Sequence, residues 1–203
     1  MRWYRMAGDQ GYVEAQFLLG LLYRNGKVVP QNYKQAVRWY RLASDQGYAM
    51  AQHNLGLMYY EGDGVSQDYQ EAARWFRLAA DQGQPRAQAS LGVMYRDGNG
   101  ITQDYKEAIR WFRLAADQGH ARAQNHLGLM YARGEGVKQD SVLAYMWANL
   151  AASQLTGKDR EGAVELKGWL TEGTGELDVM TPEEIAKAQR LALEWKPKRS
   201  GSQ

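Results

Sequence analysis

The chain has 203 residues, 44% of them hydrophobic, and a formal net charge of +2 from 25 basic and 23 acidic side chains. This near balance excludes the strong positive field of a typical nucleic-acid-binding protein, and the lack of cysteine excludes disulfides and thiolate chemistry. The longest apolar run, FLLGLLY at 17–23, is far shorter than the roughly 20 residues that span a bilayer. We therefore expect no nucleic-acid partner and no membrane insertion.

A repeat of 36 residues organises most of the sequence. The stretch WFRLAADQG occurs at 75–83 and again at 111–119. Tryptophan recurs with the same period, at Trp3, Trp39, Trp75, Trp111 and Trp147. A constant period of this length indicates stacked units that share one core, because a single small unit cannot bury its apolar faces alone. The expected organisation is a partial repeat (half of a second helix) over 1–11, four repeats over 12–154, capping helices over 155–195 and a disordered tail over 196–203.

The N-terminal end of the array is expected to be undercovered. Residues 1–10 supply only the latter half of a second helix. Apolar side chains at Trp3, Phe17 and Leu18 should therefore lie on an open flank. This flank is expected to serve self-association or to pack against a missing preceding repeat.

Each full repeat is expected to form two helices joined by a turn that contains glycine. In the period that starts at Gly47, apolar residues on one helical face predict a first helix over 48–60 and a second helix near 68–81. The stretch EGDGV separates them, because glycine adopts positive φ angles that strain other residues. In the first repeat, Lys27 and Val28 replace the Asp-Gly of the later turns. A different turn conformation is expected there.

The ends of the second helices carry capping signals. Asp68 followed by Glu71 predicts a capping box, in which each side chain accepts a hydrogen bond from the backbone N–H of the other residue. Similar pairs are Asn32 with Gln35, and Asp104 with Glu107. Glycine follows the second helices where a left-handed C-cap is favoured, at Gly47, Gly83 and Gly119.

Residues that recur in each repeat are interpreted as the shared core. A buried aromatic side chain contributes a few kcal/mol through its apolar area, which accounts for the repeated tryptophan. Glycine inside a helix costs roughly 1 kcal/mol, so glycines inside the first helices predict close helix approach, at Gly20, Gly56, Gly92 and Gly128. The predicted structural core is Trp39, Trp75, Trp111, Trp147, Leu55, Gly56, Tyr59, Leu91, Gly92 and Tyr95.

The last second helix, QDSVLAYMWANLAASQ, has lost the charged residues of its counterparts, so its outer face is apolar. A following amphipathic segment, REGAVELKGWL, is predicted to cover it. The covering residues share one helical face: Ala163, Leu166, Trp169 and Leu170. In the next segment, MTPEEIAKAQRLALEW, Thr181 suits the N-cap, Pro182 the first helical position and Glu184 the capping box. These helices form the expected terminal cap.

No local signature of catalysis or cofactor binding is present. The sequence contains no GxGxxG, Walker loop, GxSxG elbow, HExxH or EF-hand pattern. His120 and His126 are six residues apart, which places them on different sides of a helix rather than on the shared face of a metal-binding pair. Carboxylates such as Glu71 and Asp81 lie in caps or beyond helix ends, where solvated ion pairs are expected. We expect no catalytic residue, no cofactor and no metal.

A second stripe of each first helix faces away from the hairpin core, and its residues vary between repeats. Leucine or valine recurs at its centre, and its arginines can hold carboxylates bidentately. The stripe is a candidate surface for a protein or peptide with apolar and acidic groups, and the family resemblance described below implies that it lines a groove. The alternative is a solvated wall whose leucines pack only between neighbouring helices. The candidate residues are Glu14, Phe17, Leu21, Arg24, Met50, His53, Leu57, Tyr60, Arg86, Val93, Arg96, Arg122, Asn125 and Leu129.

The recurring pattern AQxxLGxxYxxGxGVxQDYxEAxRWFRLAADQG resembles the Sel-one-like repeat (SLR) family, a relative of the tetratricopeptide repeat. The resemblance covers about residues 2–153. It implies an all-α fold, a right-handed superhelical solenoid of stacked helical hairpins, with first helices lining its concave side. It also implies a role as an adaptor for other proteins. The ending MTPEEIAKAQRLALEW is similar to those of bacterial SLR proteins, which favours a bacterial source.

A non-enzymatic interaction scaffold is therefore the leading functional hypothesis. The alternative is an inhibitor, such as an immunity protein that occludes a cognate bacterial toxin or effector, a role that some SLR proteins fill. An enzyme is the third alternative, for which the chain offers neither cysteines nor an SxxK pair. Because the sequence opens partway through a repeat, it leaves open the bacterial cytoplasm and, with a signal segment removed, the periplasm.

Overall fold

A computed structural model describes residues 1–173 and 179–198, and all regular secondary structure within these ranges is α-helical. The chain separates into two compact units, Met1–Gln103 and Asp104–Gln203. Each unit is built from consecutive antiparallel helix pairs. The outer part of the expected disordered tail, 199–203, lies outside the described residues.

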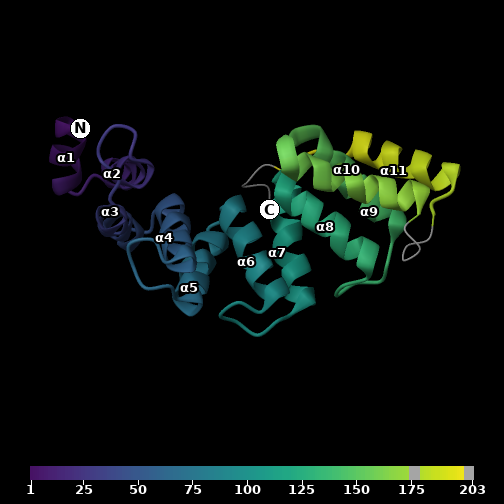
Figure 1. Cartoon of the computed structure of the whole chain (residues 1–203), viewed down its shortest axis with the longest axis horizontal. Helices are drawn as coiled ribbons and strands as arrows, with labels where there is room; N and C mark the ends of the chain where they lie inside the picture. The colour runs from purple at the N-terminus through teal and green to yellow at the C-terminus, as the bar shows by residue number, and fades with distance from the viewer. Residues whose placement is uncertain (174–178, 199–203) are drawn as a thin grey trace. The chain divides into compact units, whose positions relative to one another are not determined.

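Unit 1 is a stack of six helices (Figure 1). Helices α2 and α3 pair, as do α4 and α5, and α3 with α4 and α5 with α6 continue the stack. Each end of α4 and α5 lies at the predicted residue or one residue away from it. The helices are α1 (Arg2–Asp9), α2 (Val13–Asn25), α3 (Tyr33–Asp45), α4 (Ala49–Glu61), α5 (Tyr69–Asp81) and α6 (Pro85–Asp97).

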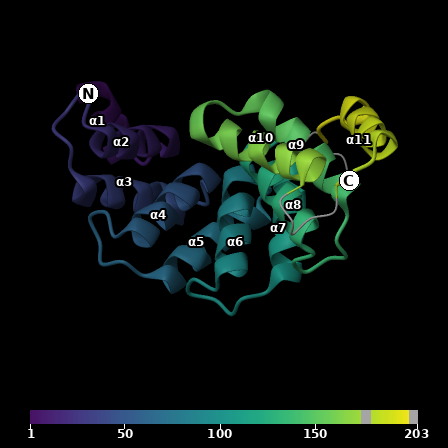
Figure 2. The ribbon, with the colours of Figure 1, turned by 45° about the vertical axis from the view of Figure 1, so that its right-hand side comes forward.

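Unit 2 repeats this arrangement and then departs from it. Helix α7 pairs with α8, and α8 pairs with α9. Both α10 and α11 pack on α9, and α10 lies alongside it in Figure 2. The apolar outer face of α9 is therefore covered by the two helices that follow it. The helices are α7 (Tyr105–Asp117), α8 (Ala121–Arg133), α9 (Ser141–Gln154), α10 (Gly157–Glu172) and α11 (Pro182–Glu194).

The N-caps of the second helices form only half of the predicted capping box. The Asp68 side chain accepts a hydrogen bond from the Glu71 backbone N–H at 3.0 Å, as predicted. However, the Asp68 backbone N–H donates to the Tyr59 carbonyl at 2.9 Å, and the Glu71 carboxylate pairs instead with Arg74 at 3.0 Å. The Tyr59 carbonyl of the first helix α4 thus takes the place that the Glu71 carboxylate would have in a complete box. Within the described helices, the complete capping box forms at Thr181.

Close helix approach at the first-helix glycines is confirmed in unit 1. A Cβ added to Gly20 would lie 2.4 Å from the Tyr40 ring, and one added to Gly56 would lie 2.7 Å from the Phe76 ring. Each ring of a second helix thus lies directly on the backbone of the preceding first helix. The left-handed C-caps are also confirmed, with φ of 84° at Gly47 and 83° at Gly83.

Tyr40 carries a buried hydroxyl with no hydrogen-bond partner among the described residues. Burial raises the pKa of Tyr40 from 10.0 to about 12, and the nearby Arg24 guanidinium partly offsets this effect. The unfolded chain therefore loses the phenolic proton at lower pH than the folded chain. The contribution to stability is complete below pH 10 and is lost as the pH rises from 10 towards 12.

Tyr40→Phe should remove this alkaline sensitivity. Between pH 9 and 11 the wild type should lose roughly 1 kcal/mol more of its free energy of unfolding than the variant. Over that range the unfolded chain loses the phenolic proton, whereas Tyr40 in the folded chain, with a pKa of about 12, keeps most of it. At pH 8 the substitution should change stability by less than about 1 kcal/mol, since no hydrogen bond is lost. Urea denaturation at several pH values measures both quantities. Parallel curves for the two proteins would contradict the assignment.

The predicted core residues are buried, with two exceptions. Trp39, Trp75, Leu55 and Leu91 are almost fully enclosed. Tyr59 and Tyr95 are only half-buried, and their hydroxyls contact the guanidinium groups of Arg41 and Arg77. These two tyrosines mark the edge of the core, because the phenol oxygen needs a polar neighbour.

A ladder of glutamine pairs, which the sequence analysis did not assign, links successive second helices, and one glutamine of each pair is buried. The Gln52 side chain donates to the Ser44 carbonyl at 3.2 Å and accepts a hydrogen bond from Gln82 at 2.7 Å. The first glutamine comes from the AQ motif of one repeat and the second from the DQG motif that ends the next helix. The same arrangement recurs at Gln16 with Gly8 and Gln46, and at Gln124 with Ala116 and Gln154.

Gln52→Leu should lower the free energy of unfolding by about 1 kcal/mol, because it removes two hydrogen bonds but keeps the buried volume. Adding Gln82→Leu should then cost little more, since the shared bond has already been lost. A double-mutant cycle measured by urea denaturation should give a coupling energy of roughly 0.5–1.5 kcal/mol. Strict additivity of the two changes would contradict the ladder. Gln70→Leu, at an exposed position of α5, is the control.

The two ends of the array differ in coverage. Trp3 is 76% exposed and Leu18 is also exposed, whereas Phe17 is half-buried against the rings of Tyr40 and Tyr48. The open flank at α1 and α2 is therefore present as expected. Val28 does not adopt a positive φ, which confirms a first turn unlike those that contain Gly64 and its equivalents.

One residue predicted to cover α9, Trp169, is not buried in the C-terminal cap. Ala163, Leu166 and Leu170 are buried, but Trp169 is 37% exposed. Trp169 directly precedes Leu170, and neighbouring helical positions are turned by about 100°, so its ring lies beside the buried stripe. The aromatic contact to α9 comes instead from Trp195, whose ring centroid lies 6.1 Å from that of Trp147.

Candidate functional site

The candidate site is a pocket of about 140 Å³ in unit 1, on the wall formed by the first helices α4 and α6. We call it the wall pocket. Four of its residues are half-buried, so it opens to the surface, while Phe76 is enclosed. The lining consists of Leu57 and Tyr60 from α4, Phe76 from α5, and Ser90 and Val93 from α6.

Helical spacing brings these residues together. Leu57 and Tyr60 are three residues apart on α4, and Ser90 and Val93 have the same spacing on α6, so each pair shares a helical face. Phe76 lies between the two helices, where it also covers Gly56. The pocket is thus a gap between two neighbouring first helices, with a second-helix ring as one of its walls.

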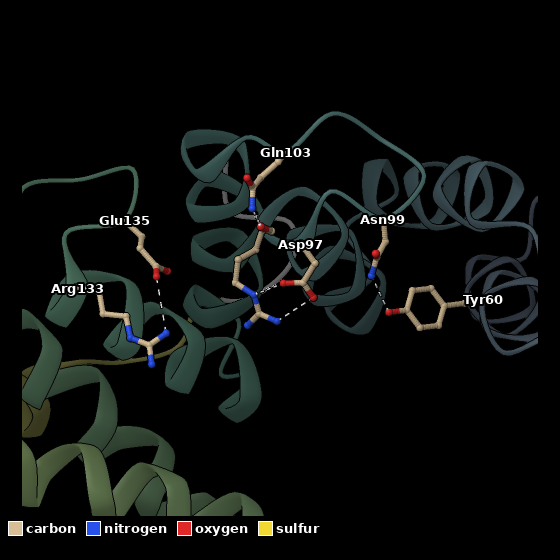
Figure 3. Close-up of polar contacts among 7 residues, drawn as sticks. Tyr60, Asp97, Asn99, Gln103, Arg133 and Glu135 are labelled. Carbon is tan, nitrogen blue, oxygen red and sulfur yellow. Dashed lines mark hydrogen bonds and ion pairs between the residues drawn. The ribbon is translucent and has the colours of Figure 1, made fainter.

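The two hydroxyl groups of the lining already have partners. The Ser90 hydroxyl lies 3.3 Å from Nε2 of His53, and the Tyr60 hydroxyl accepts a hydrogen bond from the Asn99 side chain at 3.2 Å (Figure 3). The Tyr60 ring also makes an edge contact with Tyr69, at 5.0 Å between centroids. These contacts fix the lining and leave its open surface predominantly apolar.

The structure brings only part of the predicted groove to the surface. Leu57, Tyr60 and Val93 line the wall pocket, and Met50, which is 42% exposed, lies two turns before Leu57 on α4. His53 is only 7% exposed and its ring lies 5.5 Å from that of Phe76. Its part is therefore to support the pocket from behind rather than to present a polar group to a partner.

Several predicted arginines are engaged within their own unit. In unit 1, Arg24 pairs with Glu61 at 3.4 Å. Arg96 pairs with Asp97 at 2.7 Å, and Figure 3 labels the Asp97 side chain of this pair. Among the described residues Arg86 forms no ion pair. It is exposed on α6, one turn before Ser90. Arg86 is thus the cation next to the wall pocket that remains open to a carboxylate.

The remaining candidates lie outside the wall pocket. In unit 1, Glu14 is exposed, and Phe17 and Leu21 are half-buried and pack against the core. In unit 2, Arg122 pairs with Asp159 at 2.7 Å, while Asn125 and Leu129 are half-buried. The turn at the end of α8 in unit 2 holds a separate ion pair, Arg133 with Glu135, at 3.7 Å (Figure 3).

Two lining residues, Phe76 and Ser90, were absent from the predicted groove. Phe76 belongs to the repeated WFRLAADQG stretch of the second helices, whereas the predicted groove lies on the first helices. Ser90 was overlooked although the sequence contains a signal for it. It is the smallest of the residues at its repeat position, which are Leu18, Asn54, Ser90 and His126.

Within 1–173 and 179–198 no group of three or more His, Asp or Glu side chains is placed to hold a metal ion. Over the same ranges no helix combines the length and the apolar character that crossing a membrane requires.

Stacked helix pairs with a regular period define the protein as an all-α repeat solenoid. The chain belongs to the Sel1 repeat family, whose model matches residues 1–12, 13–48, 49–84, 85–120 and 121–154. This confirms the resemblance and the fold class inferred from the sequence. No curated protein matches the chain.

Solved structures of Sel1 repeat proteins are similar to this chain. A protective antigen of uropathogenic Escherichia coli with an SLR fold is 36% identical, with a TM-score of 0.73, over 96% of this chain and 48% of its own. A Sel1 repeat protein from Oxalobacter formigenes is 31% identical, with a TM-score of 0.78, over 100% of this chain and 77% of its own. An immunity protein from Pseudomonas aeruginosa is 19% identical, with a TM-score of 0.55, over 95% of this chain and 71% of its own. The chain thus spans about half of the E. coli protein.

Proposed function

We propose that the protein is a non-enzymatic interaction scaffold whose first-helix wall in unit 1 binds a protein partner. The observation that carries the proposal is the wall pocket, an open apolar site one helical turn from the unpaired cation Arg86. Sel1 repeat proteins are in general scaffolds without catalytic activity, which agrees with this assignment. The partner is expected to present an apolar group beside a carboxylate.

Arg86→Glu should weaken partner binding by about tenfold or more, because it replaces a charge-assisted hydrogen bond with repulsion. The partner is first identified by a photo-crosslinker placed at Met50 in cells of the source organism. Its affinity for purified wild type and variants is then measured by calorimetry. Lys34→Glu makes the same charge change at an exposed position of α3 and should leave affinity unchanged. Equal affinities for wild type and Arg86→Glu would contradict the proposal.

A second candidate is inhibition of a cognate bacterial toxin or effector. Two solved structures from Pseudomonas aeruginosa with this fold are described as immunity proteins. At 19% and 20% identity they support a shared architecture. The crosslinking experiment separates the candidates, since a toxin encoded beside this protein should be captured at Met50 and lose activity when bound. A captured protein whose activity is unchanged by binding favours the scaffold.

A further inference from the structure

Unit 2 carries a ring contact at the repeat positions of two residues of the wall pocket. There, the His126 imidazole stacks on the Phe112 ring, with centroids 4.7 Å apart and planes 27° apart. The same repeat positions in unit 1 are Ser90 and Phe76, since each lies 36 residues earlier. In unit 1 the imidazole beside the phenylalanine comes from His53 on α4, with ring centroids 5.5 Å apart and planes 38° apart. Ser90 supplies only a small hydroxymethyl group, and the wall pocket remains open beside it.

We propose that the wall pocket binds one aromatic ring from the protein partner, against the Phe76 ring and beside Ser90. This rests on the proposed scaffold function and specifies the apolar group of its partner. A ring held there lies against Phe76 and between Leu57 and Val93. Paired aromatic rings prefer offset-stacked or edge-on arrangements, and the His126 contact is of the stacked kind.

The volume of the pocket matches a single ring. An engineered apolar cavity of about 150 Å³ in another protein binds benzene, and the wall pocket measures about 140 Å³. Sites for drug-sized ligands and cofactors usually measure roughly 300–1,000 Å³. One phenylalanine side chain therefore suits this pocket, and a nucleotide or similar cofactor is too large for it.

The polarity of the lining favours phenylalanine over a polar side chain. The hydroxyl of Ser90 is engaged with His53 and that of Tyr60 with Asn99. The other three lining residues are Leu57, Phe76 and Val93, whose side chains have no polar atom. A buried amide loses its hydrogen bonds with water and gains poor replacements here, which disfavours binding.

The test uses N-acetyl-phenylalaninamide as the probe and the methyl resonances of Leu57 and Val93 as the readout. We expect saturable chemical-shift changes at both residues in the wild type. Ser90→His introduces the side chain that this repeat position carries in unit 2 and should weaken the probe at least about tenfold by occupying the pocket. Ser90→Leu, which introduces the residue found at position 18, should have the same effect. Lys34→Ala, at an exposed position of α3 outside the predicted groove, should leave the affinity unchanged. N-acetyl-asparaginamide should give no saturable shift.

Absence of saturable shifts in the wild type, or equal affinity in wild type and both Ser90 variants, overturns the ring site. Far-UV circular dichroism of each variant verifies that it folds. The result is separable from that for the scaffold, since partner binding that depends on Arg86 supports the scaffold even if the probe does not bind. Conversely, the probe can bind in the pocket while Arg86→Glu leaves the affinity for the partner unchanged. That result supports the ring site and contradicts the proposed contact between Arg86 and a carboxylate of the partner.

Discussion

Trp39→Ala should lower the free energy of unfolding by about 3–5 kcal/mol, whereas Trp3→Ala should change it by less than about 0.5 kcal/mol. The two tryptophans occupy the same position of the repeat, but Trp39 is 1% exposed and Trp3 is 76% exposed. The Trp39 indole N–H has no hydrogen-bond partner among the described residues. The expected loss therefore reflects apolar burial and the cavity left behind.

Urea denaturation followed by far-UV circular dichroism measures both variants without relying on tryptophan fluorescence. The pair is matched, since the residue removed and its place in the second helix are the same. Equal losses in the two variants would show that burial in the stack is not what stabilises Trp39. A small loss in both would contradict the interpretation of the repeated tryptophan as core.

Gly64→Ala should destabilise the protein by about 2–5 kcal/mol, through backbone strain and overpacking together. Gly64 has a φ of 75°, and an added Cβ would lie 2.5 Å from the carbonyl carbon of Tyr33. Because the contact is with backbone, no side-chain rotation relieves it. The turn of one repeat is therefore held directly against the start of the preceding second helix.

Gly47→Ala is the control that separates the two contributions. Gly47 has a φ of 84°, but an added Cβ would meet no atom within 4 Å. Its cost should be limited to the conformational term, about 1–2 kcal/mol. Thermal and urea denaturation of both variants gives the difference directly. If Gly47→Ala costs as much as Gly64→Ala, the contact with Tyr33 contributes nothing.

Periodic features of the fold were predictable from the sequence because they are local and repeated. The first and second helices follow from apolar spacing, and the C-cap at Gly47 follows from the position of a single glycine. The close approach at Gly56 was also predictable, since glycine inside a helix is otherwise unfavourable. Each inference needed only one repeat and the assumption that its neighbours pack alike.

Contacts between repeats were harder to predict. Arg24 pairs with Glu61 across 37 positions, so a residue read as an open groove donor is already engaged by the next repeat. Gln52 and Gln82 lie 30 positions apart, and no helical periodicity marks them as partners. The N-cap of Asp68 formed only half its box because a distant carbonyl, that of Tyr59, competed for its backbone N–H.

The wall pocket illustrates the same limit. Leu57 and Val93 were predicted because they share a face of the first helices. Ser90 signals the pocket only when its size is compared with that of His126 and the other residues at its repeat position. Predicting the pocket from the sequence requires a comparison of side-chain volumes at one repeat position, in addition to the pattern of polarity along the helix.

The glutamine ladder has a consequence for how such arrays lengthen. Apolar surfaces tolerate sliding, but a buried amide that loses its partner is penalised, so each Gln52-type pair fixes where the next hairpin sits. A gene duplication that adds whole periods reproduces every amide pair and yields a longer array with the same register. An insertion of any other length separates a pair, so selection should favour growth in complete steps.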